Sequence, residues 1–470
     1  RLSRKMTNHL LCLGVSEARD LLGQLAGRTS TSEVDVLEAN QPIQRQALGE
    51  RPVIERIFRQ AALQLSEDEI LALLQQWIQE DKLNYLLEVV EGSHSSLVEL
   101  AASVERYQRS GVDASSLSPA TQSSIRVSLV RRLFSDDIGF MSTARHFLGL
   151  DDFHELLQRV ILLPESRGKL GGKSSGLVLA HAIVRKSPET QQLLGTVKIP
   201  KTWYLPSDAL LGFIHHNDLE DVYNWKYLEI EQIRQGYPHI VQAFKESRFP
   251  PEMVDAFSLA LDDFAGRPLI VRSSSLLEDR QGSAFSGKYK SLFLANQGSK
   301  EACLEALMDA VAEVYASIFG PDPIEYRAER GLLDTYEEMG VMIQEVVGTR
   351  VGKYFLPAFA GVAFSNNEFR WSPRIQRQDG LLRLVLGLGT RAVDRVGDDF
   401  PVLLTPGQPG LRVNVTADEA LRYSQRRIDL IDLERGTFET VPLADFLRQH
   451  GDELPLVDRL LSVVYDDVVR

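Results

Sequence analysis

The sequence is poor in cysteine and has no long apolar run. Its two cysteines, Cys12 and Cys303, belong neither to a CxxC pair nor to a Cys/His cluster with metal-ligand spacing. That excludes a zinc site visible in the sequence and is typical of a reducing compartment. No apolar run approaches the roughly 20 residues of a membrane-spanning helix, and the first residues do not form a secretion signal. We therefore expect a cytoplasmic protein without a membrane partner.

The chain also has a deficit of positive charge. Its 65 acidic residues outnumber 52 basic residues, which gives a net charge of −13. Such a field opposes binding to nucleic acid, but it allows a local basic pocket for a nucleotide. At 470 residues the chain is too long for one core, so two or three domains are expected. It does not begin with methionine, and we expect it to be a piece of a longer protein.

The two parts of the chain differ in the secondary structure that their residue patterns predict. Residues 1–163 read as helices, with a capping box at Ser66 and Glu69 and a helix that begins at Pro119. From residue 164 onward, strand-like and helical patterns alternate. The sequence predicts an all-helical N-terminal domain over 1–163 and an α/β (α+β) domain over 164–470. The first domain offers no catalytic constellation.

A strand, a serine turn and a loop of small residues follow one another near the middle of the chain. The apolar run before Arg272 reads as a strand, Ser273 begins the turn, and the loop runs over 282–287. A guanidinium at a strand end can bind two phosphate oxygens, and small residues let backbone N–H groups approach an anion. The pattern favours a polyphosphate site; an ordinary β-hairpin with a serine-rich loop is the alternative.

A second anion-binding pattern lies upstream. Gly171 and Gly172 form a turn into a helix, so Lys173 stands beside a helix N-terminus, where N–H groups favour anions. A P-loop is excluded by spacing, because three residues rather than four separate Gly168 from the Gly172-Lys173 pair.

Four stretches occur in a fixed order, each followed here by the motif that it matches. They are LGGKSSGL at 170–177 (GGKxxxLGE), VRSSSLLEDRQGSAFSG at 271–287 (VRSSAxxED and GxSFAG), VMIQEVV at 341–347 with GVAFS at 361–365 (VQxMV and GVxFS), and GLG at 387–389 (GLGE). Together they resemble the nucleotide-binding domain of phosphoenolpyruvate synthase, pyruvate phosphate dikinase and rifampicin phosphotransferase.

This resemblance implies an ATP-grasp fold and an ATP-dependent phosphotransferase of the dikinase type, with ATP and Mg²⁺ as cofactors. It implies a first lobe over about 164–340, a hinge over about 341–347 and a second lobe over about 348–470. It assigns Lys173 and Arg272 to catalysis and to the ATP phosphates. The other residues that it implies for nucleotide binding are Ser273, Glu278, Ser283, Phe285, Ser286, Gly287, Gln344, Glu345 and Val347.

The chain departs from the family at the position after GLG. By resemblance, the family's glutamate there holds Mg²⁺, and this chain has Thr390, a far weaker ligand than a carboxylate. If Thr390 begins a helix, Asp394 lies on the same face one turn later. Asp398 and Asp399 match a later acidic position of the family. We therefore expect Asp394, Asp398 and Asp399 as metal ligands. Arg391 and Arg395, four residues apart, either replace part of the metal's charge or pair with these acids.

The family passes the phosphoryl group to a histidine on a mobile domain and then to pyruvate or another acceptor. No carrier histidine follows the nucleotide domain here. The partner is therefore expected to be a phosphohistidine or pyruvate-binding domain beyond residue 470 or on another chain. The alternative is a nucleotide-binding sensor or an interaction protein with the helical domain as its output.

Overall fold

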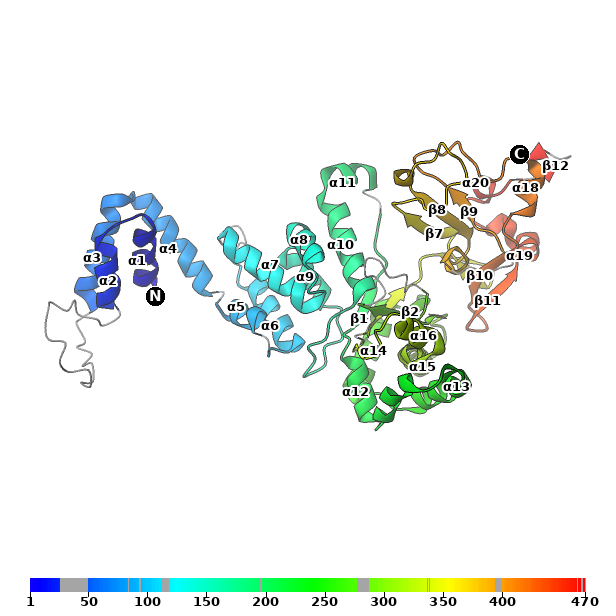
Figure 1. Ribbon diagram of the computed structural model, residues 1–470, viewed down its shortest axis with the longest axis horizontal. Helices are drawn as coiled ribbons and strands as arrows, with labels where there is room; N and C mark the ends of the chain where they lie inside the picture. The colour runs from blue at the N-terminus through cyan, green and yellow to red at the C-terminus, as the bar shows by residue number, and fades with distance from the viewer. Residues whose placement is uncertain are drawn as a thin grey trace. The chain divides into compact units, whose positions relative to one another are not determined.

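The computed structural model describes residues 1–25, 50–82, 84–92, 94–111, 118–194, 197–276, 287–335, 337, 339–393, 399–462, 464–465 and 468–469. Contacts between residues divide the chain into two compact units. One consists of Arg1–Ser95 with Glu99–Ser128, and the other of Ser96–Val98 with Leu129–Arg470 (Figure 1). None of the described helices is long and apolar enough to cross a membrane.

The described part of the first unit is helical. Its elements are α1 (Leu2–Cys12), α2 (Glu17–Leu25), α3 (Glu50–Gln64), α4 (Glu67–Lys82), α5 (Asn84–Glu91), most of α6 (Leu97–Arg109) and most of α7 (Pro119–Leu133). The capping box before α4 is present, since the Ser66 backbone N–H donates to Glu69 Oε2 at 2.8 Å and Glu69 N–H donates to Ser66 Oγ at 3.3 Å. Met6, Leu10 and Ile57 are buried in the core that α1 to α4 share.

The second unit begins with helices and a four-stranded sheet. The helices are α8 (Ile138–Phe147), α9 (Leu150–Leu157), α10 (Gly172–Lys186), α11 (Pro188–Leu194), α12 (Ala209–His216), α13 (Ile230–Glu246), α14 (Pro251–Phe264), α15 (Lys300–Ala316) and α16 (Pro321–Glu329), with 3₁₀ turns at Glu220–Tyr227 and Ser317–Phe319. The strands β1 (Thr202–Leu205), β2 (Leu269–Ser275), β3 (Ser291–Leu294) and β4 (Met339–Glu345) pair antiparallel in the order β1-β4-β2-β3.

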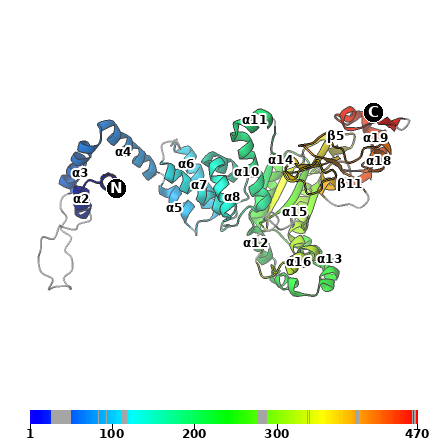
Figure 2. The ribbon, with the colours of Figure 1, turned by 45° about the horizontal axis from the view of Figure 1, so that its top comes forward.

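One face of this sheet is packed and the other carries polar groups. Leu205, Val271 and Ile343 are buried with Phe257 of α14 and Tyr315 of α15, and these helices lie beside the strands in Figure 2. Because side chains alternate along a strand, residues one step along β2 and β1 face the opposite side. Arg272 and Tyr204 are such residues, and both lie opposite Met342 of β4.

The rest of the second unit contains smaller antiparallel sheets. One sheet, in the order β11-β10-β6-β5, contains β5 (Thr349–Val351), β6 (Tyr354–Leu356), β10 (Arg427–Asp432) and β11 (Thr437–Pro442). A second sheet contains β7 (Phe359–Phe364), β8 (Leu381–Leu386) and β9 (Val402–Leu404). The two short strands β12 (Val464–Tyr465) and β13 (Val468–Val469) pair with each other. The accompanying helices are α17 (Thr390–Val393), α18 (Ala417–Arg422), α19 (Leu443–His450) and α20 (Val457–Leu460), with 3₁₀ turns at Arg377–Asp379 and Gly451–Glu453.

The predicted mixture of helix and sheet is confirmed, and its strand pairs are antiparallel, as in an α+β protein. The domain boundary between residues 163 and 164 stays a prediction; by contacts, α8 and α9 belong to the second unit. The sequence also predicts two helical pieces, over 227–235 and 238–245, broken at Gly236, and this prediction is wrong. Gly236 does not break the helical segment around it, because α13 runs unbroken from Ile230 to Glu246 with Pro238 inside it. The glycine is needed for packing there, since a Cβ at Gly236 would lie 2.2 Å from the Trp225 ring.

Candidate functional site

The two predicted phosphate motifs lie together. Lys173 Nζ donates to the carbonyl oxygen of Ser273 at 3.1 Å and lies 3.3 Å from its Oγ. The next residue along α10 makes parallel contacts, since Ser174 N–H donates to Ser274 Oγ at 3.1 Å and the two hydroxyls lie 3.0 Å apart. The N-terminus of α10 is therefore bound to the end of β2, directly after Arg272. We call this contact region, Gly171–Ser174 with Arg272–Ser274, the phosphate junction.

The phosphate junction requires glycine at position 171. Gly171 has a φ of +83°, and a Cβ there would lie 1.6 Å from the carbonyl oxygen of Ser274. No rotamer change relieves a clash with backbone. This close approach of two chain segments explains the first glycine of the turn more directly than phosphate contact does.

The segment that leads into the junction is bound by a residue that sequence reasoning missed. Asp208 Oδ1 accepts from the hydroxyl of Ser166 at 2.8 Å, and Oδ2 accepts from the backbone N–H of Arg167 at 2.6 Å. Lys169 and Ser207 add two more bonds, from Ser207 N–H to Lys169 O at 2.8 Å and from Lys169 N–H to Ser207 Oγ at 3.1 Å. The sequence signal was an aspartate just before α12, where a helix cap is expected. Asp208 does not cap α12 with its side chain.

A second missed residue, Glu337, binds both flanks of the loop after β2. It accepts hydrogen bonds from the hydroxyls of Ser275, at 2.8 Å, and Tyr289. Arg327 Nη1 lies 2.9 Å from Glu337 Oε2, with both side chains at most 4% exposed. The arginine and the two hydroxyl groups compensate the buried carboxylate for the hydration that it loses on burial.

The predicted hinge residues lie at the end of β4. Gln344 is buried and donates from Nε2 to Thr202 Oγ1 at 2.8 Å, while Glu345 Oε1 accepts from Lys201 N–H at 2.9 Å. The backbone N–H groups of Glu345 and Val346 donate to Lys201 O and Pro268 O. Val347 is 60% exposed. The backbone donors at 345 and 346 are thus used within the fold.

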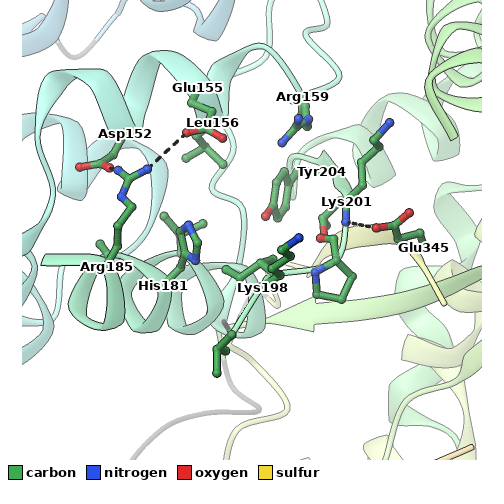
Figure 3. Close-up of a pocket in the computed structure, with 16 residues that line it drawn as sticks. Asp152, Glu155, Leu156, Arg159, His181, Arg185, Lys198, Lys201, Tyr204 and Glu345 are labelled. Atoms are coloured by element: carbon green, nitrogen blue, oxygen red, sulfur yellow. Dashed lines mark hydrogen bonds and ion pairs between the residues drawn. The ribbon is translucent and has the colours of Figure 1, made fainter. Parts of the chain in front are cut away.

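A cavity of about 400 Å³ adjoins this hinge (Figure 3). We call it the α9–α10 cavity. Tyr204 contributes a buried phenol to it, and this burial raises the Tyr204 pKa to about 12. The lining residues are Asp152, Glu155, Leu156, Arg159, Val178, His181, Ala182, Arg185, Val197, Lys198, Ile199, Pro200, Lys201, Thr202, Tyr204 and Glu345.

A second cavity, of about 380 Å³, lies between β3 and the elements around α17. Phe293 and Phe438 stack beside it with ring centroids 5.4 Å apart. Its other lining residues are Ser291, Leu292, Thr390, Arg391, Asp429 and Thr440.

Thr390 and Arg391 belong to a buried network beside the second cavity. Arg391 Nε lies 3.0 Å from Asp429 Oδ1 and its Nη1 lies 2.9 Å from Asp399 Oδ2. The hydroxyls of Thr390 and Thr440 both donate to Asp429. Of the two roles considered for Arg391, the structure shows the pairing with acids.

The described residues include one of the predicted metal ligands, Asp399. Among them, no group of three or more His, Cys, Asp and Glu side chains could hold a metal ion. Asp399 already accepts from Arg391 and from the backbone N–H groups of Phe400, Arg426 and Arg427. Mg²⁺ prefers unencumbered carboxylates and water in octahedral geometry. The metal role of Asp399 stays a prediction.

Several predicted site residues lie outside the described residues: Glu278, Ser283, Phe285, Ser286, Asp394 and Asp398. Gly287, the last residue of the predicted phosphate loop, is described and has a φ of +80°. The structure therefore joins Lys173 to Ser273, which follows Arg272 in β2. It places Glu345 at the edge of the α9–α10 cavity, and Gln344 binds the lining residue Thr202.

Comparison with known proteins identifies similar sequences. The chain is 26% identical over 175 residues to phosphoenolpyruvate synthase of Deinococcus radiodurans, covering 36% of this chain and 21% of that protein. It is 30% identical over 142 residues to phosphoenolpyruvate synthase of Escherichia coli K12, covering 29% of this chain and 16% of that protein. The chain thus matches about a fifth or less of each relative's length.

A family match covers the region that contains both phosphate motifs. Residues 167–439, more than half of the chain, match the AMP/ATP-binding domain of pyruvate phosphate dikinase. The match begins just before the Gly171 turn and ends within β11, so it includes the phosphate junction, the hinge and the Arg391 network. The chain belongs to the family of the pyruvate phosphate dikinase AMP/ATP-binding domain.

Proposed function

We propose that residues 164–470 form an ATP-grasp domain that binds ATP and donates a phosphoryl group, as in a dikinase-type phosphotransferase. The observation that carries the proposal is the contact between Lys173 and Ser273, directly after Arg272. It supports the proposal because it brings an ammonium from the N-terminus of α10 to the residue that follows Arg272. Two cations and aligned N–H groups are the chemistry that a polyphosphate needs.

In this proposal each predicted residue has one task. Lys173 and Arg272 neutralise and position the phosphates, Ser273 and the loop from Ser283 to Gly287 cover them, and the hinge from Gln344 to Val347 receives the base. Positioning and charge neutralisation supply most of the catalysis in phosphoryl transfer. Mg²⁺, with Asp394, Asp398 and Asp399 as predicted ligands, would neutralise further phosphate charge.

Calorimetric titration with ATP tests the binding. Lys173→Ala and Arg272→Ala should each weaken ATP binding about ten- to hundredfold, because a hydrogen bond to a charged group contributes on the order of 1.5–3 kcal/mol. Lys300→Ala is the control, since Lys300 pairs with Asp262 at the surface and should leave the affinity unchanged. Wild-type affinity in both folded site variants would refute the assignment.

The second candidate is a nucleotide sensor without turnover. The observation that favours it is the Arg391 network, in which Thr390 stands at the family's glutamate position and Asp429 and Asp399 are occupied by an arginine. Incubation with ATP and Mg²⁺ or Mn²⁺, followed by assay of AMP, ADP and protein-bound phosphate, separates the two candidates. Turnover supports the phosphotransferase, and binding without any turnover supports the sensor.

The names of the relatives suggest which molecule accepts the phosphoryl group, and we give this acceptor as a proposal. Phosphoenolpyruvate synthases are named for a product made from pyruvate, so a phosphohistidine or pyruvate-binding domain beyond residue 470 or on another chain is the proposed partner. The 470-residue chain alone should therefore form no phosphoenolpyruvate from ATP and pyruvate. Detection of that product with the purified chain would show that the acceptor site lies within it.

A further inference from the structure

The α9–α10 cavity is built from two sources. Glu155, Leu156 and Arg159 come from α9 and the residues just after it, which precede the family match that begins at residue 167. Val178, His181 and Arg185 come from α10, within the match. The cavity therefore combines the nucleotide-binding domain with a helix that the family match does not include, and Glu345 is the one lining residue that is assigned above to nucleotide binding.

The charged groups of the cavity do not all have partners within the fold. Arg185 pairs with Asp152 and, at 3.8 Å, with Glu155, as Figure 3 shows. Lys201 lies 2.9 Å from Asp263. Among the described residues, neither Arg159 nor Lys198 forms an ion pair, although both line the cavity.

Two of the cavity's three carboxylates are engaged within the fold, and the third, Glu155, lies 3.8 Å from Arg185 with its side chain 60% exposed. Asp152 binds Arg185 and Lys186, and Glu345 accepts from the backbone N–H of Lys201. Arg159 and Lys198 thus have no direct ion-pair partner among the described residues, although Arg159 lies near enough to Asp263 to help lower the pKa of that carboxyl. The carboxylates of the lining contribute mainly to pairs that the fold itself makes. The charge left for a ligand is positive, so the ligand is an anion.

The uncharged lining residues indicate which kind of molecule would carry the anionic group. Leu156, Val178, Ala182, Val197, Ile199 and Pro200 supply apolar surface, and Tyr204 supplies an aromatic ring. Figure 3 shows Tyr204 between the side chains of Arg159 and Lys198. Apolar walls with a few convergent polar groups are typical of small-molecule pockets, and about 400 Å³ lies within their usual size range.

We propose that the α9–α10 cavity binds a small organic anion, a phosphate or carboxylate on an apolar body, between Arg159 and Lys198. This site is distinct from the phosphate junction. His181, which lines the cavity, follows Lys173 by eight positions on α10, or about 12 Å along the helix axis. Lys173 itself does not line the cavity.

The ligand class is tested by titrating small probe molecules into the full 470-residue chain and measuring their binding by saturation-transfer NMR. Phenyl phosphate and benzoate carry the two anionic heads on the same ring, and phenol is the neutral control. We expect saturable binding of at least one of the two anions and at least tenfold weaker binding of phenol. Phenol binding as tightly as both anions, or no saturable binding of either anion, would overturn the proposal.

Variants locate the site. Arg159→Ala and Lys198→Ala should each weaken binding of the anionic probe about tenfold or more, and Lys198→Glu should weaken it further; Lys198 is exposed, so its variants should fold. Lys300→Ala, which removes a surface ion pair with Asp262 outside the cavity lining, should leave probe affinity unchanged. Displacement of the probe by ATP, or wild-type affinity in folded Arg159 and Lys198 variants, would overturn a separate anion site.

Discussion

Lys173 Nζ donates a hydrogen bond of 3.1 Å to the carbonyl oxygen of Ser273, 100 residues further along the chain. The contact holds the ammonium beside the residue that follows Arg272. An ammonium is stabilised by a polar or anionic partner. The Ser273 carbonyl is one such partner, and a phosphate bound at the junction would be a stronger one.

The first prediction concerns Gly171. Gly171→Ala should lower the free energy of unfolding by at least about 2–3 kcal/mol, because a Cβ there meets the Ser274 carbonyl and because φ is +83°. ATP affinity should fall as well, since α10 can no longer approach β2. Urea denaturation and calorimetry measure the two effects.

Gly176→Ala, in the same helix, is the matched control. A Cβ at Gly176 meets nothing within 4 Å. Alanine should therefore stabilise α10 by about 0.5–1 kcal/mol through lower unfolded-state entropy. Equal stability losses in the two variants would contradict the close approach at Gly171.

The second prediction concerns Arg391, which lies between two buried carboxylates. Arg391→Met should destabilise the protein by about 3–5 kcal/mol, because it leaves Asp399 and Asp429 without their cation. Arg377→Ala is the control. Arg377 pairs with Glu368 at the surface, with both side chains more than half exposed, and its loss should cost at most about 1 kcal/mol. An Arg391 variant with wild-type stability in urea denaturation would show that the network does not hold this region together.

The third prediction concerns the departure at position 390. Thr390→Glu places a second carboxylate beside Asp429, where Thr390 now donates a hydrogen bond. Like-charge repulsion should destabilise this variant without metal, and Mg²⁺ or Mn²⁺ should restore stability and strengthen ATP binding. Thr390→Gln introduces a side chain of the same size as glutamate but without its charge. The stability and ATP affinity of this variant should not depend on the metal. If melting temperature and ATP affinity respond equally to Mg²⁺ in both variants, position 390 is not beside a metal site.

The fourth prediction concerns alkaline pH. Burial raises the Tyr204 pKa to about 12, whereas an unfolded tyrosine titrates near 10. The unfolded chain therefore loses the proton first, so this contribution to stability is complete below about pH 10 and is lost as the pH rises toward 12. Tyr204→Phe should reduce the loss of unfolding free energy between about pH 9.5 and 11, where one pKa unit corresponds to about 1.4 kcal/mol.

Tyr237 supplies a comparison for this measurement, because burial also raises its pKa to about 12. Tyr237→Phe should reduce the alkaline loss in the same direction, and the double variant should reduce it further. An unchanged pH profile in the Tyr204 variant would contradict a protonated, buried phenol in the α9–α10 cavity.

Much of the fold follows from local sequence. The capping box at Ser66, the proline that opens α7, the limits of α14 and the hairpin of β10 and β11 are all set by residues close together in the chain. Such features depend on helix caps, proline geometry and side-chain periodicity, which neighbouring residues determine. The same holds for the two phosphate motifs, each a contiguous run.

The tertiary structure alone decided what these motifs contact. The sequence marked Thr390 as a departure, but only the fold shows that Asp429, 39 residues later, accepts its hydroxyl and also pairs with Arg391. Asp208 directly precedes α12, yet its side chain does not cap that helix and binds the segment before Lys173. These contacts join residues distant in sequence, and no local pattern encodes the pairing of strands and helices that brings them within hydrogen-bond distance.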